Sequence, residues 1–295
     1  MRVLLLGAQG FIGRHIDRSL SAAGHEVVRA GSGRRPVPGL LQVDFARDTD
    51  VARWLPRLQG FGAVVNAVGV LRDTSARPMR AVHEATPKAL FDACALAGVR
   101  RVVQVSALGI EGNPTRYART KLAADAHLQA LTAAGRLDGV VIRPSIVFGR
   151  EGDSSRMFMG LARSPLLVLP GAVIEARVQP VAVQDLADAV AALLQGDGLA
   201  RNGVLPCVGP SPLGLAGFIA SLRGQLGHGA ARVARLPERL TRLSVRVGDA
   251  LPFAPWCSET LALLAQDNVG PAEVLAELLG RPALPHSQMV ARSWR

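Results

Sequence analysis

The sequence predicts an α/β fold built on a doubly wound parallel sheet, and two observations lead to this prediction. Short apolar segments, typical of strands, alternate with segments that have the 3.6-residue apolar period of amphipathic helices. Such alternation implies crossover connections, which join parallel strands. The apolar strands, such as residues 3–6, are also nearly continuous. That pattern is typical of a sheet covered by helices on both faces.

The elements follow one another regularly through the first half of the chain. We predict strands at residues 2–6, 26–29, 40–43, 63–66, 101–105 and 140–143. We predict helices between them at residues 11–23, 48–58, 79–97 and 117–134. After Pro144 the elements become shorter, and residues 186–194 are expected to form a helix that returns to the main sheet.

We therefore divide the chain into a core and a small C-terminal α+β lobe. The core comprises residues 1–150 and 179–200, and the lobe comprises residues 151–178 and 201–295. Beyond Gly203 the chain is richer in proline and glycine, as expected of short elements and loops. We expect the lobe to lie over the carboxyl edge of the sheet, where open α/β folds bind their ligands, and to contact a small-molecule substrate.

Composition excludes several classes of function. The net charge of +11 comes almost entirely from scattered arginines without a basic run, which argues against nucleic-acid binding. No apolar run is long enough for a membrane span, so we expect no transmembrane segment. Cys94, Cys207 and Cys257 are far apart and odd in number, which argues against a disulfide framework or a metal site and favours the cytoplasm.

A glycine-rich loop directly follows the first predicted strand and opens a helix. Gly7 permits the tight turn, Gly10 lets backbone N–H groups approach a pyrophosphate, and Gly13 permits close helix–strand packing. The positive end of the helix adds attraction for phosphate. The loop therefore predicts a dinucleotide-binding Rossmann unit; the alternative is a structural turn in a ligand-free domain. The predicted contacts are Gly7, Gln9, Gly10, Phe11, Ile12 and Gly13.

The end of the second strand selects the cofactor. NAD-specific folds usually place a carboxylate there, whereas residues 28–35 contain no acid. Arg29 or Arg34, with Ser32 as a donor, is expected to meet a 2′-phosphate, so the sequence favours NADP over NAD. Solvated surface arginines are the alternative. Asp44 is a candidate acceptor for the adenine amino group or, alternatively, a helix N-cap.

The pair Tyr117 and Lys121 carries the predicted chemistry. Tyr117 is the only tyrosine of the chain, and Lys121 is one of two lysines. Four residues apart on a helix, they share a face. An ammonium beside a phenol is expected to lower the phenol pKa, so that Tyr117 acts as a general acid or base while Lys121 also binds ribose hydroxyls. The alternative is a buried tyrosine with a solvated lysine.

Two further segments complete the predicted site. Ser106, which ends the fifth strand, is expected to polarise the substrate oxygen or, alternatively, to cap the strand end. Small residues after the fourth strand place backbone beside the cofactor. These residues are Asn66, Ala67, Val68 and Gly69.

Together these residues resemble the short-chain dehydrogenase/reductase superfamily in its extended, epimerase-like branch. The resemblance rests on the glycine loop, Asp44, residues 66–69, residues 105–107, the Tyr117–Lys121 pair and residues 143–144, where it implies cofactor contact at Pro144. Residues 261–269 resemble the tail of proteins similar to the nucleotide-binding accessory subunit of respiratory complex I. Many members carry a second hydroxyl residue beside the strand-five serine, where this chain has Ala107.

Two functions follow as hypotheses. The first is an NADP(H)-dependent oxidoreductase or epimerase-like enzyme with Tyr117, Lys121 and Ser106 as catalytic residues. The second is a non-catalytic nucleotide-binding accessory or sensor protein linked to respiratory or quinone metabolism. Residues 237–253, which set Arg239, Arg242 and Arg246 among leucines and valines, predict either peripheral membrane contact or an ordinary surface helix.

Overall fold

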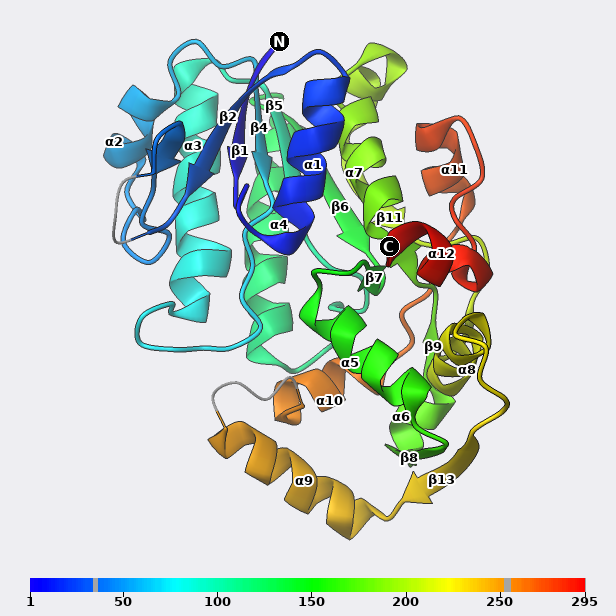
Figure 1. The fold of residues 1–295 in the computed structure, drawn as a ribbon. Helices are drawn as coiled ribbons and strands as arrows, with labels where there is room; N and C mark the ends of the chain where they lie inside the picture. Colours follow the sequence, from blue (N-terminus) through cyan, green and yellow to red (C-terminus); the bar gives the residue numbers. More distant parts are fainter. Residues whose placement is uncertain (34–36, 252–255, 295) are drawn as a thin grey trace.

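The computed structural model describes residues 1–33, 37–251 and 256–294. Its centre is a seven-stranded parallel sheet in the order β11-β6-β5-β4-β1-β2-β3 (Figure 1). The strands are β1 (Arg2–Leu6), β2 (Glu26–Gly31), β3 (Leu40–Gln42), β4 (Ala63–Asn66), β5 (Arg101–Val105), β6 (Asp138–Pro144) and β11 (Gly203–Cys207). The predicted doubly wound fold is confirmed. Strand order reverses between β1 and β4, so the crevice at their carboxyl ends is the expected ligand site.

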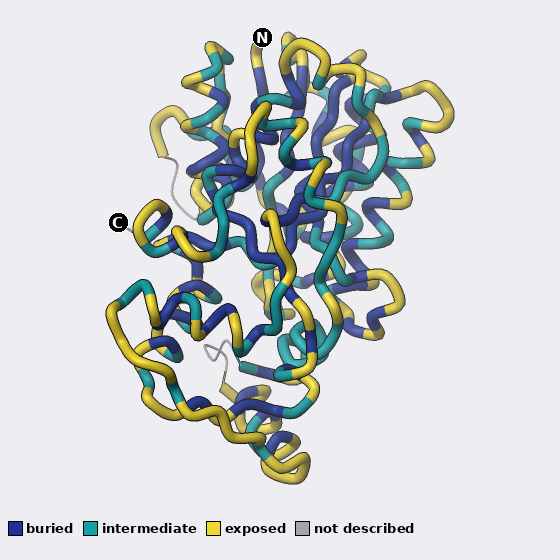
Figure 2. Tube along the Cα trace, turned by 90° about the vertical axis from the view of Figure 1, so that its right-hand side faces the viewer, coloured by how far each residue is buried: buried dark blue, intermediate teal, exposed yellow. Residues whose placement is uncertain are grey.

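The sheet is apolar on both faces because alternate residues of each strand enter different cores. Val3 and Leu5 of β1 pack into one core, and Leu4 and Leu6 pack into the other. The first core lies under α1 (Phe11–Ala22), α7 (Val183–Ala192) and α11 (Glu273–Leu279). The second lies under α2 (Val51–Trp54), α3 (Thr86–Ala97) and α4 (Arg116–Ala133). Figure 2 shows the buried residues gathered along the strands of this sheet.

Two predicted helices differ from the structure, and proline explains both differences. The helix expected at residues 48–58 is only α2, followed by the 3₁₀ turn η1 (Leu55–Arg57), because Pro56 has no N–H for a continuing α-helix. The helix expected at residues 79–97 contains a π-helical turn, η2 (Ala81–Ala85), just before Pro87 at the start of α3. A wider turn accommodates the proline ring, and it carries His83 to the candidate site.

The remaining elements form a lobe beyond the carboxyl edge of the sheet (Figure 1). Its core is an apolar cluster in which Phe148 and Phe158 meet Phe218 edge to face. The elements are β7 (Val147–Phe148), α5 (Asp153–Arg163), β8 (Leu166–Pro170), α6 (Gly171–Glu175), β9 (Arg177–Val178), β10 (Val181–Ala182), β12 (Leu213–Gly214), α8 (Leu215–Gln225), β13 (Arg232–Leu236), α9 (Glu238–Ala250), α10 (Ser258–Leu264), η4 (His286–Gln288) and α12 (Met289–Ser293). The 3₁₀ turn η3 (Gly196–Ala200) lies instead at the amino edge of the sheet, where Arg101 at the start of β5 donates to the backbone oxygen of Gly198 at 2.8 Å.

The C-terminal part of the chain contributes to both units. β11 pairs in parallel with β6 as an edge strand of the main sheet, and α11 packs into the core beneath α1 and α7. The sequence division, which starts the second part of the lobe at residue 201, thus separates these elements from the sheet they join. Within the described ranges, no helix is both long and apolar enough to cross a bilayer.

Candidate functional site

The glycine loop has the geometry that close backbone approach requires. Gly7 has φ of +77°, a left-handed conformation that other residues rarely adopt. A Cβ on Gly13 would lie 2.0 Å from the carbonyl oxygen of Gly7, so only glycine fits where α1 meets the loop. Gly10 precedes α1 without a side-chain cap, and the first turn contains no acidic residue. The positive end of α1 therefore faces the crevice as a place for an anion.

Two cavities at the carboxyl edge form one groove across this loop. Their volumes are about 520 Å³ and about 310 Å³, and they share Gly10, Ala67, Val68, Gly69 and Val70. The larger cavity continues to the tyrosine–lysine helix, and the smaller one continues to the end of β2. This elongated shape, with the helix end at its middle, fits a dinucleotide whose pyrophosphate crosses the glycine loop.

The smaller cavity is lined by several predicted cofactor residues. Gln9, Ser32 and Asp44 all face it, and so does Arg77, which the sequence analysis missed. The Asp44 carboxylate also accepts the backbone N–H of Ala46 at 3.0 Å, so it both shapes its turn and borders the cavity. Arg77 comes from the loop between β4 and η2, far in sequence from β2, and only the tertiary fold brings it to this cavity.

The structure places Arg29 elsewhere. Its guanidinium donates to the Asp17 carboxylate of α1 at 2.8 Å and does not line either cavity of the groove. This ion pair raises the pKa of Arg29 through the hydrogen bond to Asp17 and its charge. The position is a consequence of strand alternation, because Arg29 sits two residues before the end of β2 and points over α1. Arg34 lies outside the described residues.

Asn66 shapes the middle of the groove from within the protein. It is buried, its amide donates to Gln104 at 2.8 Å, and its oxygen accepts the N–H of Val68 at 3.2 Å. Asn66 itself is absent from both cavity linings, whereas Ala67, Val68 and Gly69 line both. Of the four predicted residues, three border the groove and the fourth fixes their turn.

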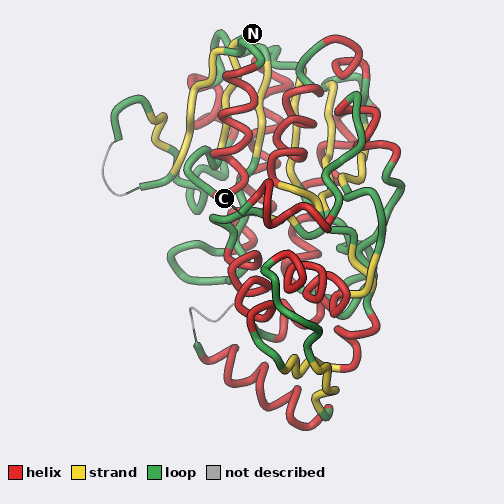
Figure 3. Tube along the Cα trace, turned by 45° about the vertical axis from the view of Figure 1, so that its right-hand side comes forward, coloured by secondary structure: helices red, strands yellow, loops and turns green. Residues whose placement is uncertain are grey.

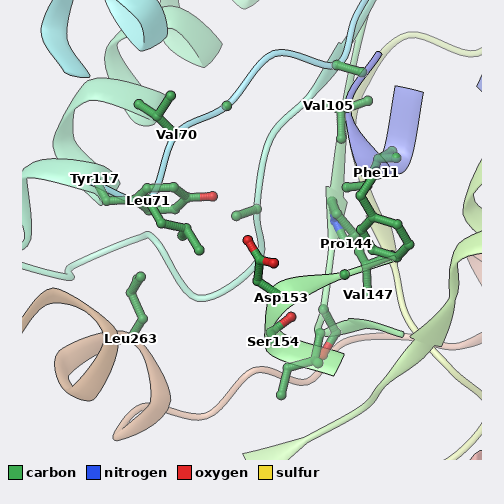
Figure 4. A pocket seen from close by; sticks show the side chains of 18 of the residues that line it. Phe11, Val70, Leu71, Val105, Tyr117, Pro144, Val147, Asp153, Ser154 and Leu263 are labelled. Carbon is green, nitrogen blue, oxygen red and sulfur yellow. The ribbon is translucent and has the colours of Figure 1, made fainter. Parts of the chain in front are cut away.

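Tyr117 and Lys121 meet in the larger cavity, at the start of α4. The Tyr117 hydroxyl points into the cavity beside Leu71, across from the first residues of α5 (Figure 4). The buried Lys121 ammonium donates to the backbone oxygen of Val105 at 3.0 Å and lies 5.8 Å from the Tyr117 ring centroid. Phe11 and Pro144 line the same cavity.

The electrostatics of this pair differ from the expected lowering of the phenol pKa. Burial, with the negative charge of Asp125 as a second cause, raises the pKa of Tyr117. Burial also lowers the pKa of Lys121 to about 8. Tyr117 is therefore a neutral phenol, suited to donate a proton, and Lys121 changes its charge just above neutral pH.

Ser106 lines the larger cavity, but its hydroxyl is already engaged. It donates to Oδ2 of Asp125 at 2.8 Å, and Arg143 donates to the same oxygen at 3.1 Å. Asp125 is fully buried, and burial raises its pKa despite these partners and Lys121. Sequence analysis missed Asp125, although its spacing of four residues after Lys121 places it on the same face of α4.

His83 is a further residue to which the sequence analysis assigned no role. Its ring packs edge to face on Tyr117, with centroids 5.3 Å apart. Its Nε2 accepts the backbone N–H of Val70 at 2.9 Å, and Nδ1 lies 3.2 Å from the Thr120 hydroxyl. Burial, with the charge of Lys121, lowers the pKa of His83 to about 2. His83 is thus a neutral positioning residue that ties the groove wall to the tyrosine.

The C-terminal segment holds the tyrosine helix from the other side. Glu259 of α10 accepts the backbone N–H groups of Arg116 and Tyr117 at 3.0 and 3.1 Å, and thereby caps α4. Nearby, Asn268 donates to the carbonyl oxygen of Leu108 at 2.8 Å. The segment at residues 261–269, noted for its resemblance, therefore packs on the loop between β5 and α4.

We predict that Glu259→Gln weakens this cap. The charged carboxylate also interacts with the positive end of α4, so its loss should cost about 1 kcal/mol of unfolding free energy. Chemical denaturation of the variant measures this cost. Glu273→Gln, at the start of α11, is a matched control because no hydrogen bond to another helix depends on it in the described chain. An equal loss in both variants would contradict the capping role.

The parallel sheet, the glycine loop on its first strand and the tyrosine–lysine helix after its fifth define a protein of the short-chain dehydrogenase/reductase type. The chain belongs to the NAD dependent epimerase/dehydratase family, whose model matches residues 3–204.

Comparisons with known proteins add relatives of different function. A ceramide reductase of Caulobacter vibrioides is 28% identical over 248 residues, which are 82% of this chain and 73% of that protein. Subunit 9 of the mitochondrial NADH dehydrogenase 1 alpha subcomplex of Arabidopsis thaliana is 28% identical over 221 residues, 70% of this chain and about half (53%) of the relative. The solved NADPH-dependent quinone oxidoreductase of Escherichia coli, complexed with NADPH, matches with a TM-score of 0.74 at 16% identity, covering 99% of this chain and 100% of that one.

Proposed function

We propose that this chain is an NADP(H)-dependent reductase of an apolar carbonyl or quinone substrate. The observation that carries the proposal is the single groove, which joins the glycine loop to the Tyr117 hydroxyl and the Lys121 ammonium. Leu71, Ile146 and Leu263 are among the apolar residues that line its tyrosine end. The names of two similar proteins, a ceramide reductase and a quinone oxidoreductase, support this substrate class.

The residues of the groove fit the cofactor. The backbone N–H groups at the start of α1 would hold the pyrophosphate, and Lys121 would hold the nicotinamide ribose. When bound, the nicotinamide supplies the hydride. Tyr117 then gives its proton to the substrate oxygen as negative charge develops there, and the neutral phenol favoured by burial is the form that this step needs. Ser106 and Asp125 hold the wall of the site behind Tyr117.

The choice of NADP(H) rests on the end of β2 and on Arg77. The strand ends at Gly31 and is followed by Ser32, without a carboxylate, and Arg77 provides a cation in the smaller cavity. We expect Arg77→Ala to weaken NADPH binding about tenfold and NADH binding by less than about twofold. Titration calorimetry of both nucleotides measures the two constants. Equal losses for both nucleotides would contradict recognition of a 2′-phosphate by Arg77.

The reaction is tested by following NADPH oxidation with a panel of apolar ketones and quinones. Turnover with at least one of them supports the reductase. The second candidate is a non-catalytic nucleotide-binding subunit, favoured by the engaged Ser106 hydroxyl and by the similarity to the Arabidopsis subunit. Tight NADPH binding without oxidation across the panel would favour this candidate and overturn the reductase.

We predict a loss of NADPH affinity above pH 8. The pKa of Lys121, lowered from 10.5 to about 8, means that its ammonium is present at neutral pH and is lost as the pH rises through 8. Since the ammonium is the proposed ribose ligand, affinity should fall about tenfold by pH 9. Lys121→Arg, which stays charged, should bind more weakly at pH 7 but show no such decline. A flat wild-type profile between pH 7 and pH 9 would exclude a charged Lys121 in binding.

A further inference from the structure

Helix α9 exposes an unusual apolar stripe. Leu240, Leu243, Val247 and Leu251, each between 51% and 59% exposed, follow one side of the helix and its end. A different side, with Thr241, Val245 and Gly248, is buried against the lobe. A Cβ on Gly248 would lie 1.9 Å from the backbone oxygen of Trp256, so this contact is tight. The apolar stripe is therefore not the side that holds the helix in place.

Arginines occupy the third side of the same helix. At 3.6 residues per turn, Arg239, Arg242 and Arg246 lie roughly a third of a turn from the apolar stripe. Arg242 is paired with Glu238, whereas Arg239 and Arg246 have no ion pair with any described residue. The helix thus presents a row of aliphatic side chains flanked by a row of cations.

The strand that precedes α9 and its partner strand also expose apolar side chains. β13 pairs with β8 in parallel, with Arg232 beside Leu166 and Ala234 beside Val168. Leu166 and Val168 are 50% and 47% exposed. β13 leads directly into α9 at Pro237, and both elements form the far end of the lobe (Figures 1 and 3). This end of the molecule therefore exposes apolar and arginine side chains on both elements.

We propose that this end of the lobe, with α9 as its main element, docks on an anionic phospholipid bilayer. An apolar stripe flanked by cations matches the boundary between acyl chains and headgroup phosphates, and the unpaired arginines give the charge complementarity. The net charge of +11 attracts the whole chain to such a surface. The stripe lies on an exposed helix at the far end of the lobe (Figure 1), which suits insertion into a fluid interface better than a socket in a folded partner.

Docking would also bring the candidate site near the lipid. α10 follows α9 and is tied to it by hydrogen bonds from Ser258 to Asp249, the backbone one at 2.9 Å. Thr260, Leu263 and Leu264 of α10 form one wall of the larger cavity. The proposed docking surface and this cavity are therefore joined through two neighbouring helices, although the docking itself does not depend on the proposed reaction.

The test is binding of the full chain to vesicles, measured by co-sedimentation at low salt. We expect the protein to bind vesicles of phosphatidylglycerol and phosphatidylcholine, and to bind vesicles of pure phosphatidylcholine at least tenfold more weakly. The reason is that each arginine near an anionic membrane surface contributes ~1 kcal/mol to binding. The double variant Arg239→Gln and Arg246→Gln should lose roughly 30-fold in affinity for the anionic vesicles. Leu243→Gln with Val247→Gln should lose about tenfold or more at any salt concentration.

Matched controls keep this test specific. Arg18→Gln with Arg136→Gln removes the same charge elsewhere, and Leu96→Gln changes an exposed leucine of α3. Both controls should bind nearly as the wild type, and thermal unfolding checks that every variant is folded. The proposal is overturned if the wild type fails to bind anionic vesicles, or if stripe and control variants bind alike. It is also overturned if Leu243→Gln with Val247→Gln dissociates an oligomer, seen by sedimentation velocity, and leaves lipid binding unchanged.

Discussion

Replacement of Tyr117 by phenylalanine should reduce turnover by about 10²- to 10⁴-fold and leave NADPH affinity within about threefold of the wild type. The substitution removes only the hydroxyl that points into the larger cavity. The ring that packs edge to face on His83 is retained, so the local fold should persist. Because Tyr117 is the only tyrosine of the chain, no second phenol substitutes for it.

Steady-state kinetics with the substrate found in the NADPH oxidation panel measure this effect. The loss should appear in kcat, since the proton is transferred only as the transition state forms. His83→Phe serves as a comparison, because it perturbs the packing of the tyrosine without removing its proton, and it should have a smaller effect on kcat. Turnover of Tyr117→Phe within about twofold of the wild type would remove Tyr117 from the proton transfer.

Much of the fold was predictable because it depends on local patterns. The strands at residues 63–66 and 101–105 agree with β4 and β5, and the glycine loop lies where predicted, between β1 and α1. Apolar runs indicate a strand buried on both faces, and the glycine spacing indicates a turn. Each of these patterns lies within a short stretch of sequence. The edge strand β11 was not predicted, because its pairing with β6 depends on a segment about 60 residues away.

The candidate site was also predictable only where its residues lie close together in the sequence. Tyr117 and Lys121 meet because one helical turn separates them, and that spacing is visible in the sequence. Arg77 lines the groove, whereas His83 and Glu259 contact Tyr117, and only the folded chain brings these residues together. Glu259, for example, accepts the backbone N–H of Tyr117 from 142 positions away. The prediction for Arg29 considered only that this residue lies near the end of β2. Because side chains alternate between the two faces of a strand, Arg29 points instead to Asp17 of α1.

The largest expected effect on stability concerns Asp125. Its carboxylate is fully buried and forms an ion pair with Arg143, whose side chain is also nearly inaccessible to solvent. The same carboxylate accepts a hydrogen bond from the Ser106 hydroxyl. Asp125→Ala would leave the Arg143 cation with only Glu111, whose side chain is 77% exposed. Breaking a buried pair from one side is strongly unfavourable, so we expect a loss of about 3 kcal/mol of unfolding free energy.

Urea denaturation of the wild type, Asp125→Ala and Asp125→Asn separates charge from shape. Because burial raises the pKa of Asp125, the neutral form is less unfavourable here than in water. Asparagine resembles that neutral form and still accepts the Ser106 hydrogen bond, so its cost should be about half that of alanine. Asp92→Ala is the control, since its pair with His127, at 2.9 Å, lies on a more exposed part of the same helix layer and should contribute less than about 1 kcal/mol. If Asp125→Ala costs no more than Asp92→Ala, the buried network does not stabilise the tyrosine helix, and the support for Tyr117 must come from His83 and the C-terminal cap instead.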